Sequence, residues 1–473
     1  MALSGSWSNG ELTRTRIGAE KRGLTWSQAI LIIVALVCGT TAACLAPKLF
    51  FDAMLLVAQI GFLCLAAWRI VLVLVGRPPS PEVASREALP RYTIMAALYD
   101  EAEVVSQLIG RLSRIEYPAD RLEAFILLEA HDLETIQAAE ACPRPDWLQI
   151  LVVPPGSPKT KPRALNYGLA RATGDLLTIY DAEDDPDPLQ LREAAARFAA
   201  DESGRIACFQ SPLRIRRLAR RAHASPFLDR QFAVEYAALF EVTLPAMARL
   251  GLPFPLGGTS NHFRVDVLRS IGGWDAWNVT EDADLGFELW RAGWRLGVLR
   301  RPTYETPPGP LHYWLPQRVR WLKGYMQTWG VHTRRPNALG RRGSLSLVMT
   351  LGAAILSAAA HAPTLAWLVL AVAVWALSGV LPPLPGGSLG VLALGVIVAW
   401  MSCAAGARRA GLDYRLGDVL AAPAYWALLS LAFVHAAWRL AVEPHVWDKT
   451  PHDRDDQMPE LTVVALDAGR EAA

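Results

Sequence analysis

The sequence has 473 residues, of which 52% are hydrophobic and 19% are charged. An average soluble domain is about 45–50% apolar and about 25% charged, so this chain is more apolar than a typical cytosolic enzyme. Residues 343–442 contain only six charged side chains: Arg408, Arg409, Asp413, Arg415, Asp418 and Arg439. The composition excludes a simple cytosolic enzyme, a disordered protein and a disulfide scaffold. A net charge of +2 gives no reason to expect nucleic acid as a partner.

Two apolar runs follow a basic N-terminal segment. The run 27–46 has no charge over the roughly 20 residues that a helix needs to cross a bilayer, and the run 53–75 has one, Arg69. Basic residues precede the first run and no small-residue cleavage site follows it, so we predict an anchor and not a signal peptide. We therefore expect residues 1–26 to be cytoplasmic and residues 27–76 to form two transmembrane helices.

The C-terminal part is apolar again. Within residues 343–442 the pattern predicts about four transmembrane helices, at roughly 345–361, 363–381, 388–407 and 417–440. Six spans in all place the loop with Arg408, Arg409 and Arg415 outside, against the usual bias of basic residues toward the cytoplasm. Either these arginines reach the interface or pair locally, or one of the four stretches does not cross. Residues 443–473 form a tail that we expect to be cytoplasmic.

Between the membrane blocks, short apolar runs alternate with segments of helical spacing. The predicted strands are Tyr92–Leu98, Ala124–Leu128, Leu148–Val153 and Leu176–Tyr180, with predicted helices at Ala102–Leu112 and Arg163–Arg171. This order is typical of a mostly parallel α/β sheet covered by helices on both faces. Ligands bind beyond the carboxyl ends of the strands in such sheets, so the residues that follow each strand are the first candidates for a site.

An acidic cluster follows the fourth predicted strand. It places five carboxylates within seven positions: Asp181, Glu183, Asp184, Asp185 and Asp187. Such a cluster repels itself unless a cation is bound, and hard divalent ions such as Mg²⁺ take oxygen ligands and usually keep phosphate oxygens in their shell. We therefore predict a site for a metal ion and a diphosphate. The alternative is a solvated acidic turn at the start of a helix.

Three further segments fit the same chemistry. Lys159 and Lys161 stand at a helix start, with Pro162 in its first turn, where free backbone N–H groups suit a phosphate. The segment 280–284 brings more carboxylates to the start of another helix. Finally, Gln317, Arg320 and Trp321 are spaced at i, i+3 and i+4, so they share one helix face and suit a phosphorylated sugar.

Two of these segments carry a family resemblance. Residues 280–282 (Thr-Glu-Asp) and 317–321 (Gln-Arg-Val-Arg-Trp) resemble the TED and QxxRW motifs of the processive, membrane-embedded members of glycosyltransferase family 2. That group includes bacterial cellulose synthase, curdlan synthase and hyaluronan synthase. The resemblance covers about residues 90–335. It implies a GT-A-type, Rossmann-like glycosyltransferase domain flanked by transmembrane helices. We also expect interfacial helices in this region, because aromatic and basic residues are mixed along residues 314–329.

The resemblance also implies roles for individual residues. Asp282 would be the general base, and Asp181 and Glu183 would occupy the metal-binding DxD places, although Glu183 departs from the second Asp and Asp184 can share its role. The donor-binding residues would be Tyr99, Glu101, Glu129, Lys161, Asn166, Asp181, Gln317 and Arg320, with Asp132 as the alternative to Glu129. The acceptor-binding residues would be Gly258, Thr259, Thr280, Glu281 and Trp321. The implied cofactor is Mg²⁺ or Mn²⁺.

The tail contains a last motif. Trp447, Lys449, Thr450 and His452 resemble the WxKTxH ending of one bacterial branch of the family. In the cellulose enzymes a gating loop folds over the bound nucleotide, and the resemblance implies a similar gating role for this segment. The alternative is an interfacial anchor of Trp and Lys.

The resemblance implies an inverting hexosyltransferase of the inner (plasma) membrane with a cytoplasmic catalytic domain. It would transfer sugar from a UDP-sugar, UDP-glucose in the first instance, to a growing β-linked polysaccharide and translocate the product. Its partners would be the UDP-sugar, the polysaccharide, the lipid bilayer and, as a further class, accessory export subunits. Two alternatives stay open: a single-addition transferase acting on a lipid or lipid phosphate, and a membrane receptor that kept the fold without catalysis.

Overall fold

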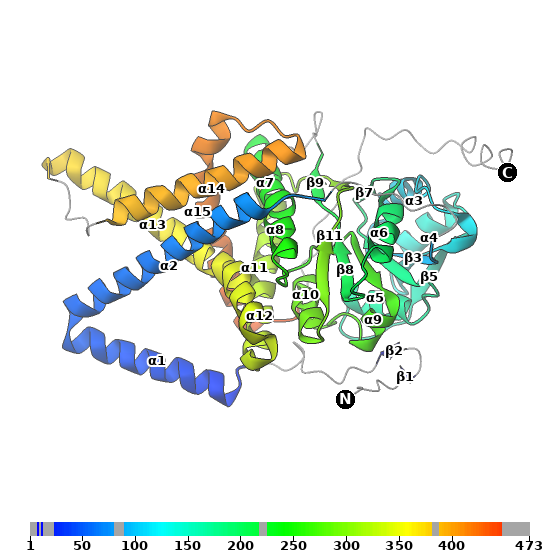
Figure 1. Cartoon of the computed structure of the whole chain (residues 1–473), viewed down its shortest axis with the longest axis horizontal. Helices are drawn as coiled ribbons and strands as arrows, with labels where there is room; N and C mark the ends of the chain where they lie inside the picture. The colour runs from blue at the N-terminus through cyan, green and yellow to red at the C-terminus, as the bar shows by residue number, and fades with distance from the viewer. Residues whose placement is uncertain are drawn as a thin grey trace.

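The computed structural model describes residues 23–79, 89–216, 225–380 and 387–446, together with two short strands, β1 (Trp7–Ser8) and β2 (Glu11–Leu12). These residues form an α/β domain from which long helices extend to one side (Figure 1). The predicted gating residues Trp447, Lys449, Thr450 and His452 lie outside the described residues.

The domain is built on a seven-stranded sheet with the strand order β11-β8-β10-β6-β3-β4-β5. Its strands are β3 (Tyr92–Leu98), β4 (Leu122–Glu129), β5 (Leu148–Val153), β6 (Leu176–Tyr180), β8 (Ile206–Gln210), β10 (Asn261–Arg264) and β11 (Arg295–Val298). Strand β10 runs antiparallel to both of its neighbours, and the other pairings are parallel. The predicted α/β class is confirmed, and three of the four predicted strands have the predicted bounds.

Successive residues of β3 serve two different cores, because side chains alternate across a strand. Ile94 packs with the helices on one face, and Met95 packs with the helices on the other. The helices of the first face are α3 (Val105–Leu112), α4 (Leu133–Ala141) and α6 (Gln190–Ala199); those of the second are α5 (Lys161–Leu169), α9 (Val265–Ser270) and α10 (Glu281–Arg291). The sheet is therefore buried on both faces.

A small second sheet supports the acidic segment. Its order is β7-β12-β9, with β7 (Asp185–Pro186), β12 (Thr303–Glu305) and β9 (Leu213–Ile215). A short 3₁₀ turn, η2 (Ala119–Arg121), precedes β4.

Two helical segments lie between the domain and the long apolar helices. The first consists of α7 (Pro226–Ala238), a π-helical turn, η3 (Leu239–Thr243), and α8 (Leu244–Arg249). The second is α11 (Leu311–Thr333), which carries the predicted Gln317–Trp321 motif. Both contribute buried side chains to the domain core, among them Phe232 and Trp314.

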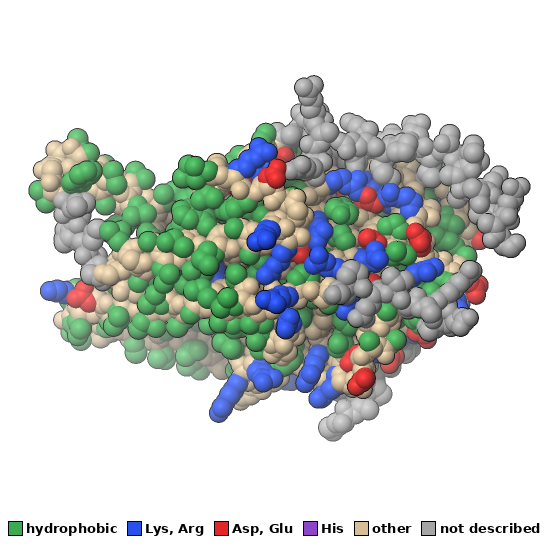
Figure 2. Space-filling view, turned by 45° about the horizontal axis from the view of Figure 1, so that its top comes forward, with side chains coloured by type: hydrophobic (Ala, Val, Ile, Leu, Met, Phe, Trp, Pro, Cys, Tyr) green, Lys and Arg blue, Asp and Glu red, His purple; other side chains and the backbone are tan. Residues whose placement is uncertain are grey.

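Among the residues that the structure describes, five helices are long and apolar enough to cross a membrane. They are α1 (Trp26–Leu45), α2 (Pro47–Val75), the run Pro336–Ser378, α14 (Ser388–Ala410) and α15 (Leu416–Val442). The run Pro336–Ser378 consists of η4 (Pro336–Leu339), α12 (Gly340–Leu347), η5 (Val348–Gly352) and α13 (Ala353–Ser378). Figure 2 shows apolar side chains over this part of the molecule and Lys and Arg side chains gathered where it meets the domain.

The described residues of the C-terminal block differ from the prediction of about four transmembrane helices, because they form three long apolar helices. The stretches 345–361 and 363–381 form one helical run, and Pro363 lies inside α13. The Ser430 hydroxyl of α15 donates to the Ala358 carbonyl and accepts a hydrogen bond from the Ala362 N–H at 2.9 Å. It therefore links the two backbone groups that would otherwise bond each other directly within the helix, next to the proline. A side chain inserted into the backbone hydrogen bonds of a helix can accommodate a proline. Helix α13 therefore continues through Pro363, where the sequence suggested a break.

Candidate active site

A cavity of about 1410 Å³ begins at the carboxyl ends of the sheet strands and continues between α2, α13 and α14. All but one of the predicted site residues that the structure describes line it. They are Tyr99, Glu101, Glu129, Lys161, Asp181, Glu183, Gly258, Thr259, Thr280, Glu281, Asp282, Gln317, Arg320 and Trp321. The fold thus brings together residues from Tyr99 to Trp321, which are more than two hundred positions apart in the sequence.

The acidic segment divides into two groups. Asp184 is fully buried, accepts the backbone N–H of Asp181 at 2.7 Å and accepts the Thr259 hydroxyl. Burial, with the charges of Asp181 and Glu183, raises the pKa of Asp184. Asp184 is not among the residues that line the cavity, and its contacts hold the backbone of Asp181 and the side chain of Thr259.

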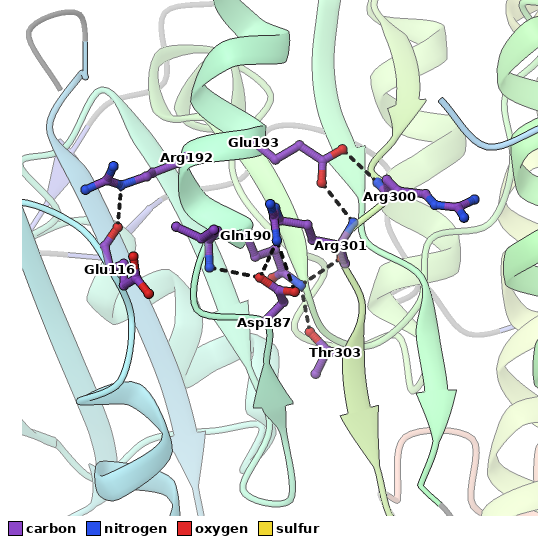
Figure 3. A network of polar contacts seen from close by, with 9 residues as sticks. Glu116, Asp187, Gln190, Arg192, Glu193, Arg300, Arg301 and Thr303 are labelled. Atoms are coloured by element: carbon purple, nitrogen blue, oxygen red, sulfur yellow. Dashed lines mark hydrogen bonds and ion pairs between the residues drawn. The ribbon is translucent and has the colours of Figure 1, made fainter. Parts of the chain in front are cut away.

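The last two acids of the segment are also paired. Asp185 forms ion pairs with Arg114 and Arg216. Asp187 accepts two hydrogen bonds from Arg301 Nη1, at 3.0 and 3.2 Å, within a network that also joins Gln190 to Thr303 (Figure 3). Only Asp181 and Glu183 of the five acids therefore line the cavity.

Lys161 lies at the start of α5 and faces the acidic segment. Its ammonium group donates to Asp181 and, at 2.7 Å, to the carbonyl oxygen of Gly258. Burial alone would lower the pKa of Lys161, but the charges of Asp181 and Glu281 outweigh it and raise the pKa. The site therefore holds a permanent cation directly beside the carboxylate that is predicted to bind the metal ion.

Glu281 and Asp282 are the first two residues of helix α10. Burial raises the pKa of Asp282, and burial together with the charge of Asp282 raises the pKa of Glu281 to about 7. The positive charges of Lys161 and Arg320 partly oppose both shifts. A half-buried carboxylate with a raised pKa in a cavity has the properties of a general base.

Gly258 separates the two functional carboxylates. A β-carbon at this position would lie 3.4 Å from Asp282 Oδ2 and 3.8 Å from Asp181 Oδ2. The loop is held by Gln210, which accepts the N–H of Gly257 at 2.7 Å and donates to the carbonyl of Thr259 at 3.0 Å. A glycine here leaves room for a ligand between the acids, because no side chain fills the space between them.

Helix α11 presents Gln317, Arg320 and Trp321 to the cavity, as the i, i+3 and i+4 spacing predicted. Gln317 Oε1 is buried and accepts no hydrogen bond from the described residues. Buried polar atoms without a partner are rare and call for a ligand or water. The amide of Gln317 therefore suits a hydroxyl group of a bound sugar.

The same helix positions the Thr-Glu-Asp segment. Gly324 packs so closely on Thr280 that an added β-carbon would lie 2.3 Å from its hydroxyl oxygen. Gln327 accepts the N–H of Val279 at 3.2 Å, and Thr328 accepts from the side chain of Asn278 at 3.0 Å. The two motifs thus form one packed unit.

Behind the motif, a group of contacts surrounds the buried side chain of Arg318, and the sequence gave no indication of it. Arg318 makes two hydrogen bonds with Glu235, at 2.9 and 2.7 Å, and donates to the Tyr425 hydroxyl at 2.8 Å. Its guanidinium also lies 4.5 Å from the ring centroid of Trp321. Arg318 occupies an unspecified position of QxxRW, so the motif gave no signal for it.

The remaining predicted donor residues differ in position. Glu129 lines the cavity and pairs with Arg163 at 2.9 and 2.7 Å, whereas Asp132 caps helix α4 through the N–H of Thr135. The structure therefore places Glu129 and not Asp132 at the site. Asn166 does not line the cavity, because both ends of its amide bond the backbone of Trp274 at 2.9 Å.

The pair Asp181 and Glu183 has the chemistry of a partial Mg²⁺ or Mn²⁺ site. Among the described residues, no group of three or more His, Cys, Asp or Glu side chains is arranged to hold a metal ion. Mg²⁺ is usually held by one or two carboxylates together with waters and substrate phosphates. Two carboxylates at a strand end therefore fit an ion that arrives with a diphosphate.

Comparison with known proteins agrees with the fold. Residues 90–324 match the family described as "Glycosyltransferase like family 2". The solved mannosyltransferase PcManGT from Pyrobaculum calidifontis, in complex with GDP-Man and Mn²⁺, has a TM-score of 0.53 and 21% identity, covering 82% of this chain and 96% of that one. The predicted fold class, a GT-A-type glycosyltransferase domain with flanking apolar helices, is therefore established.

Curated relatives match the same part of the chain. A probable glycosyltransferase, YdaM, from Bacillus subtilis is 23% identical over 50% of this chain and 55% of its own length. A beta-monoglucosyldiacylglycerol synthase from Synechocystis is 27% identical over 52% of this chain and 51% of its own length. The cellulose synthase 1 catalytic subunit from Komagataeibacter xylinus is 28% identical over 54% of this chain and 33% of its own length. The chain thus spans about half the length of the first two relatives and a third of the last.

Proposed function

We propose that the chain is a membrane-bound inverting hexosyltransferase that uses a nucleoside diphosphate sugar, UDP-glucose in the first instance, to extend a β-linked polysaccharide. The observation that carries the proposal is the approach of Asp181 and Asp282 on either side of Gly258, in a cavity that continues between apolar helices. One carboxylate is held by a lysine beside the strand end, and the other has a raised pKa.

The donor diphosphate binds beside β6. The Lys161 ammonium and the Arg320 guanidinium stabilise the negative charge that grows on the leaving diphosphate. A divalent ion held by Asp181 and Glu183 supplies further charge neutralisation when it is bound. The solved mannosyltransferase with this fold is in complex with GDP-Man and Mn²⁺, which supports a nucleoside diphosphate sugar and a divalent ion as ligands.

The acceptor approaches from the side of Asp282. Asp282 accepts the proton of the attacking hydroxyl, Trp321 offers an aromatic face to the sugar ring, and Gln317 Oε1 accepts from a sugar hydroxyl. Attack from the face opposite the diphosphate inverts the anomeric centre, so an α-linked donor gives a β-linked product. Alignment of the two substrates supplies much of the rate enhancement.

A lipid acceptor is the second candidate. The cavity extends along α2 and α14 past largely apolar side chains such as Phe62, Leu72 and Val396. Such a wall suits an acyl chain, and the Synechocystis relative is named for glucosyldiacylglycerol synthesis. The QxxRW motif, which resembles that of the polymerising branch, favours the polysaccharide.

Sugar transfer in membrane vesicles tests both candidates. Vesicles with the full chain or with Asp282→Asn receive individual radiolabelled nucleotide sugars and Mg²⁺ or Mn²⁺. We expect UDP-glucose label in a large product that β-glucan hydrolases degrade, and none with Asp282→Asn. Label that partitions into chloroform–methanol as a small glycolipid supports the lipid acceptor, and no transfer from any nucleotide sugar contradicts both candidates.

A further inference from the structure

The long apolar helices differ in where their two ends lie. Helix α1 begins at the domain, where Gln28 donates to the Gly330 carbonyl of α11 at 3.0 Å. Helix α2 returns to it, because Gly76 at its end packs against Val242 and Ala246. These helices extend away from the domain and meet at their far ends (Figure 1).

Helices α13 and α14 form a similar pair. Helix α13 leaves the domain as the continuation of α12, and α14 comes back to it. Near the end of α14, Arg409 donates to the carbonyl of Glu241 in η3 at 2.7 Å and to that of Val73 at 3.4 Å. The ends of α2 and α14 therefore lie at the same level, beside the domain.

Helix α15 begins beside the domain. Asp418, in its first turn, is ion-paired with Arg230 of α7, and Arg230 also donates to the Asp413 carbonyl at 2.9 Å. Gln231 donates to the Asp418 carbonyl at 2.7 Å. Three contacts from α7, which packs against the domain core, hold this end.

The other end of α15 is also held by the domain. Lys323 of α11 donates to the Val446 carbonyl at 2.6 Å, and Gln327 donates to the Pro444 carbonyl at 2.6 Å. The His445 ring Nδ1 donates to the Trp277 carbonyl at 2.9 Å. Between the ends, Tyr425 donates to Glu235 of α7 at 2.7 Å. A helix that crossed the bilayer would have only one end beside the domain.

The outward side of α15 is apolar. Its most exposed large hydrophobic side chains are Leu416, Leu420, Leu431, Val434, Trp438 and Val442. The opposite side, with Tyr425, Ala432 and Ala436, is buried against α11 and neighbouring helices. Of the five apolar helices, α15 has the lowest mean hydropathy and the largest buried share.

We propose that α15 does not cross the membrane but lies along the bilayer surface on the side of the domain, with its apolar stripe in the headgroup region. A helix with one protein-bound face and one apolar face that carries Trp fits this region. The chain then crosses four times, through α1, α2, α13 and α14. Arg408, Arg409 and Arg415 lie on the same side as the domain, which removes the conflict with the distribution of basic residues.

Cysteine labelling tests this topology in the full chain. Asp413→Cys and Glu443→Cys, which flank α15, are introduced separately after the six native cysteines are replaced. Glu202→Cys in the domain and Val380→Cys after α13 mark the two sides. An impermeant maleimide is applied to intact cells and to inverted vesicles.

We expect positions 413 and 443 to be labelled from the same side as position 202 and position 380 from the opposite side. Labelling of 413 and 443 from opposite sides overturns the proposal. If the cysteine-free chain is not made, a fluorescent protein and an alkaline phosphatase fused to the C-terminus of the native chain give the same information. Neither assay requires sugar transfer, so the result is independent of the proposed function.

A depth measurement tests the contact with lipid. A fluorophore at Leu431→Cys, near the middle of α15, is compared with one at Leu36→Cys, near the middle of α1, in bilayers with quenchers at the headgroup or at the chain end. We expect the headgroup quencher to be more effective for position 431 and the chain-end quencher for position 36. Stronger quenching of position 431 from the bilayer centre contradicts the proposal.

Discussion

Two acidic segments border the cavity, and they differ in how their carboxylates are used. In the segment after β6, Asp184, Asp185 and Asp187 bond a hydroxyl or arginine side chains, and Asp181 and Glu183 line the cavity. At the start of α10, Asp282 and Glu281 both line the cavity and both have raised pKa values. Residue type alone therefore does not distinguish a structural acid from a functional one; the partners supplied by the fold do.

The largest expected effect concerns the base. Asp282→Asn keeps the shape of the side chain but removes its ability to accept a proton, and we expect the transfer rate to fall about 10²–10⁴-fold. Initial rates in vesicles at saturating donor measure this. Nucleotide binding should persist, and a variant with full activity would show that another group is the base.

The packing of α11 on Thr280 can be tested with a matched pair of glycine-to-alanine variants. Gly324→Ala places a β-carbon 2.3 Å from the Thr280 hydroxyl oxygen, whereas Gly330→Ala on the same helix meets nothing within 4 Å. A displacement of about 1 Å can cost about 10²-fold in rate, so we expect such a loss for Gly324→Ala only. Equal rates for the two variants would show that the contact does not position the segment.

The division of the first segment predicts a contrast in metal dependence. Asp181→Asn removes a predicted metal ligand and should raise the Mn²⁺ concentration for half-maximal activity more than about tenfold. Asp185→Asn loses its pairs with Arg114 and Arg216, so it should lower stability by roughly 1–3 kcal/mol and leave the metal requirement unchanged. Metal titrations and thermal inactivation separate the two effects, and the same metal shift in both variants would refute the division.

The smallest effect is a shift in pH dependence. The pKa of Glu281 is raised to about 7 by burial and by Asp282, so the pair retains a proton below that pH and activity falls as the pH decreases. Glu281→Gln leaves Asp282 alone beside Lys161 and Arg320, whose positive charges lower its pKa. The acidic limb of the kcat/KM profile should therefore move to lower pH. A shift to higher pH would contradict the coupling.

Much of the fold followed from local patterns. The apolar runs Tyr92–Leu98 and Leu176–Tyr180 predicted strands with correct bounds, and helical spacing placed Gln317, Arg320 and Trp321 on one face. These features depend on residues close in the sequence, and local patterns describe such residues well.

Features that depend on distant partners were not predictable in this way. Nothing in the sequence near Asn166 indicates that its side chain bonds the backbone of Trp274, more than a hundred residues away. Likewise, the sequence does not distinguish Arg318 from the other basic residues, because its partners Glu235 and Tyr425 come from distant parts of the chain. The continuity of α13 through Pro363 depends on Ser430, a residue of another helix.

The Ser430 contact has a mechanical consequence. The Ser430 hydroxyl links Ala358 and Ala362 of α13, so the continuity of α13 past Pro363 depends on the docking of α15. If α15 moves away, the bond is lost next to Pro363, and α13 gains a hinge beside His361 and Thr364, which line the cavity. If α15 lies at the membrane surface as we propose, its docking would then control the width of the cavity where it continues from Asp181 and Asp282 between the apolar helices.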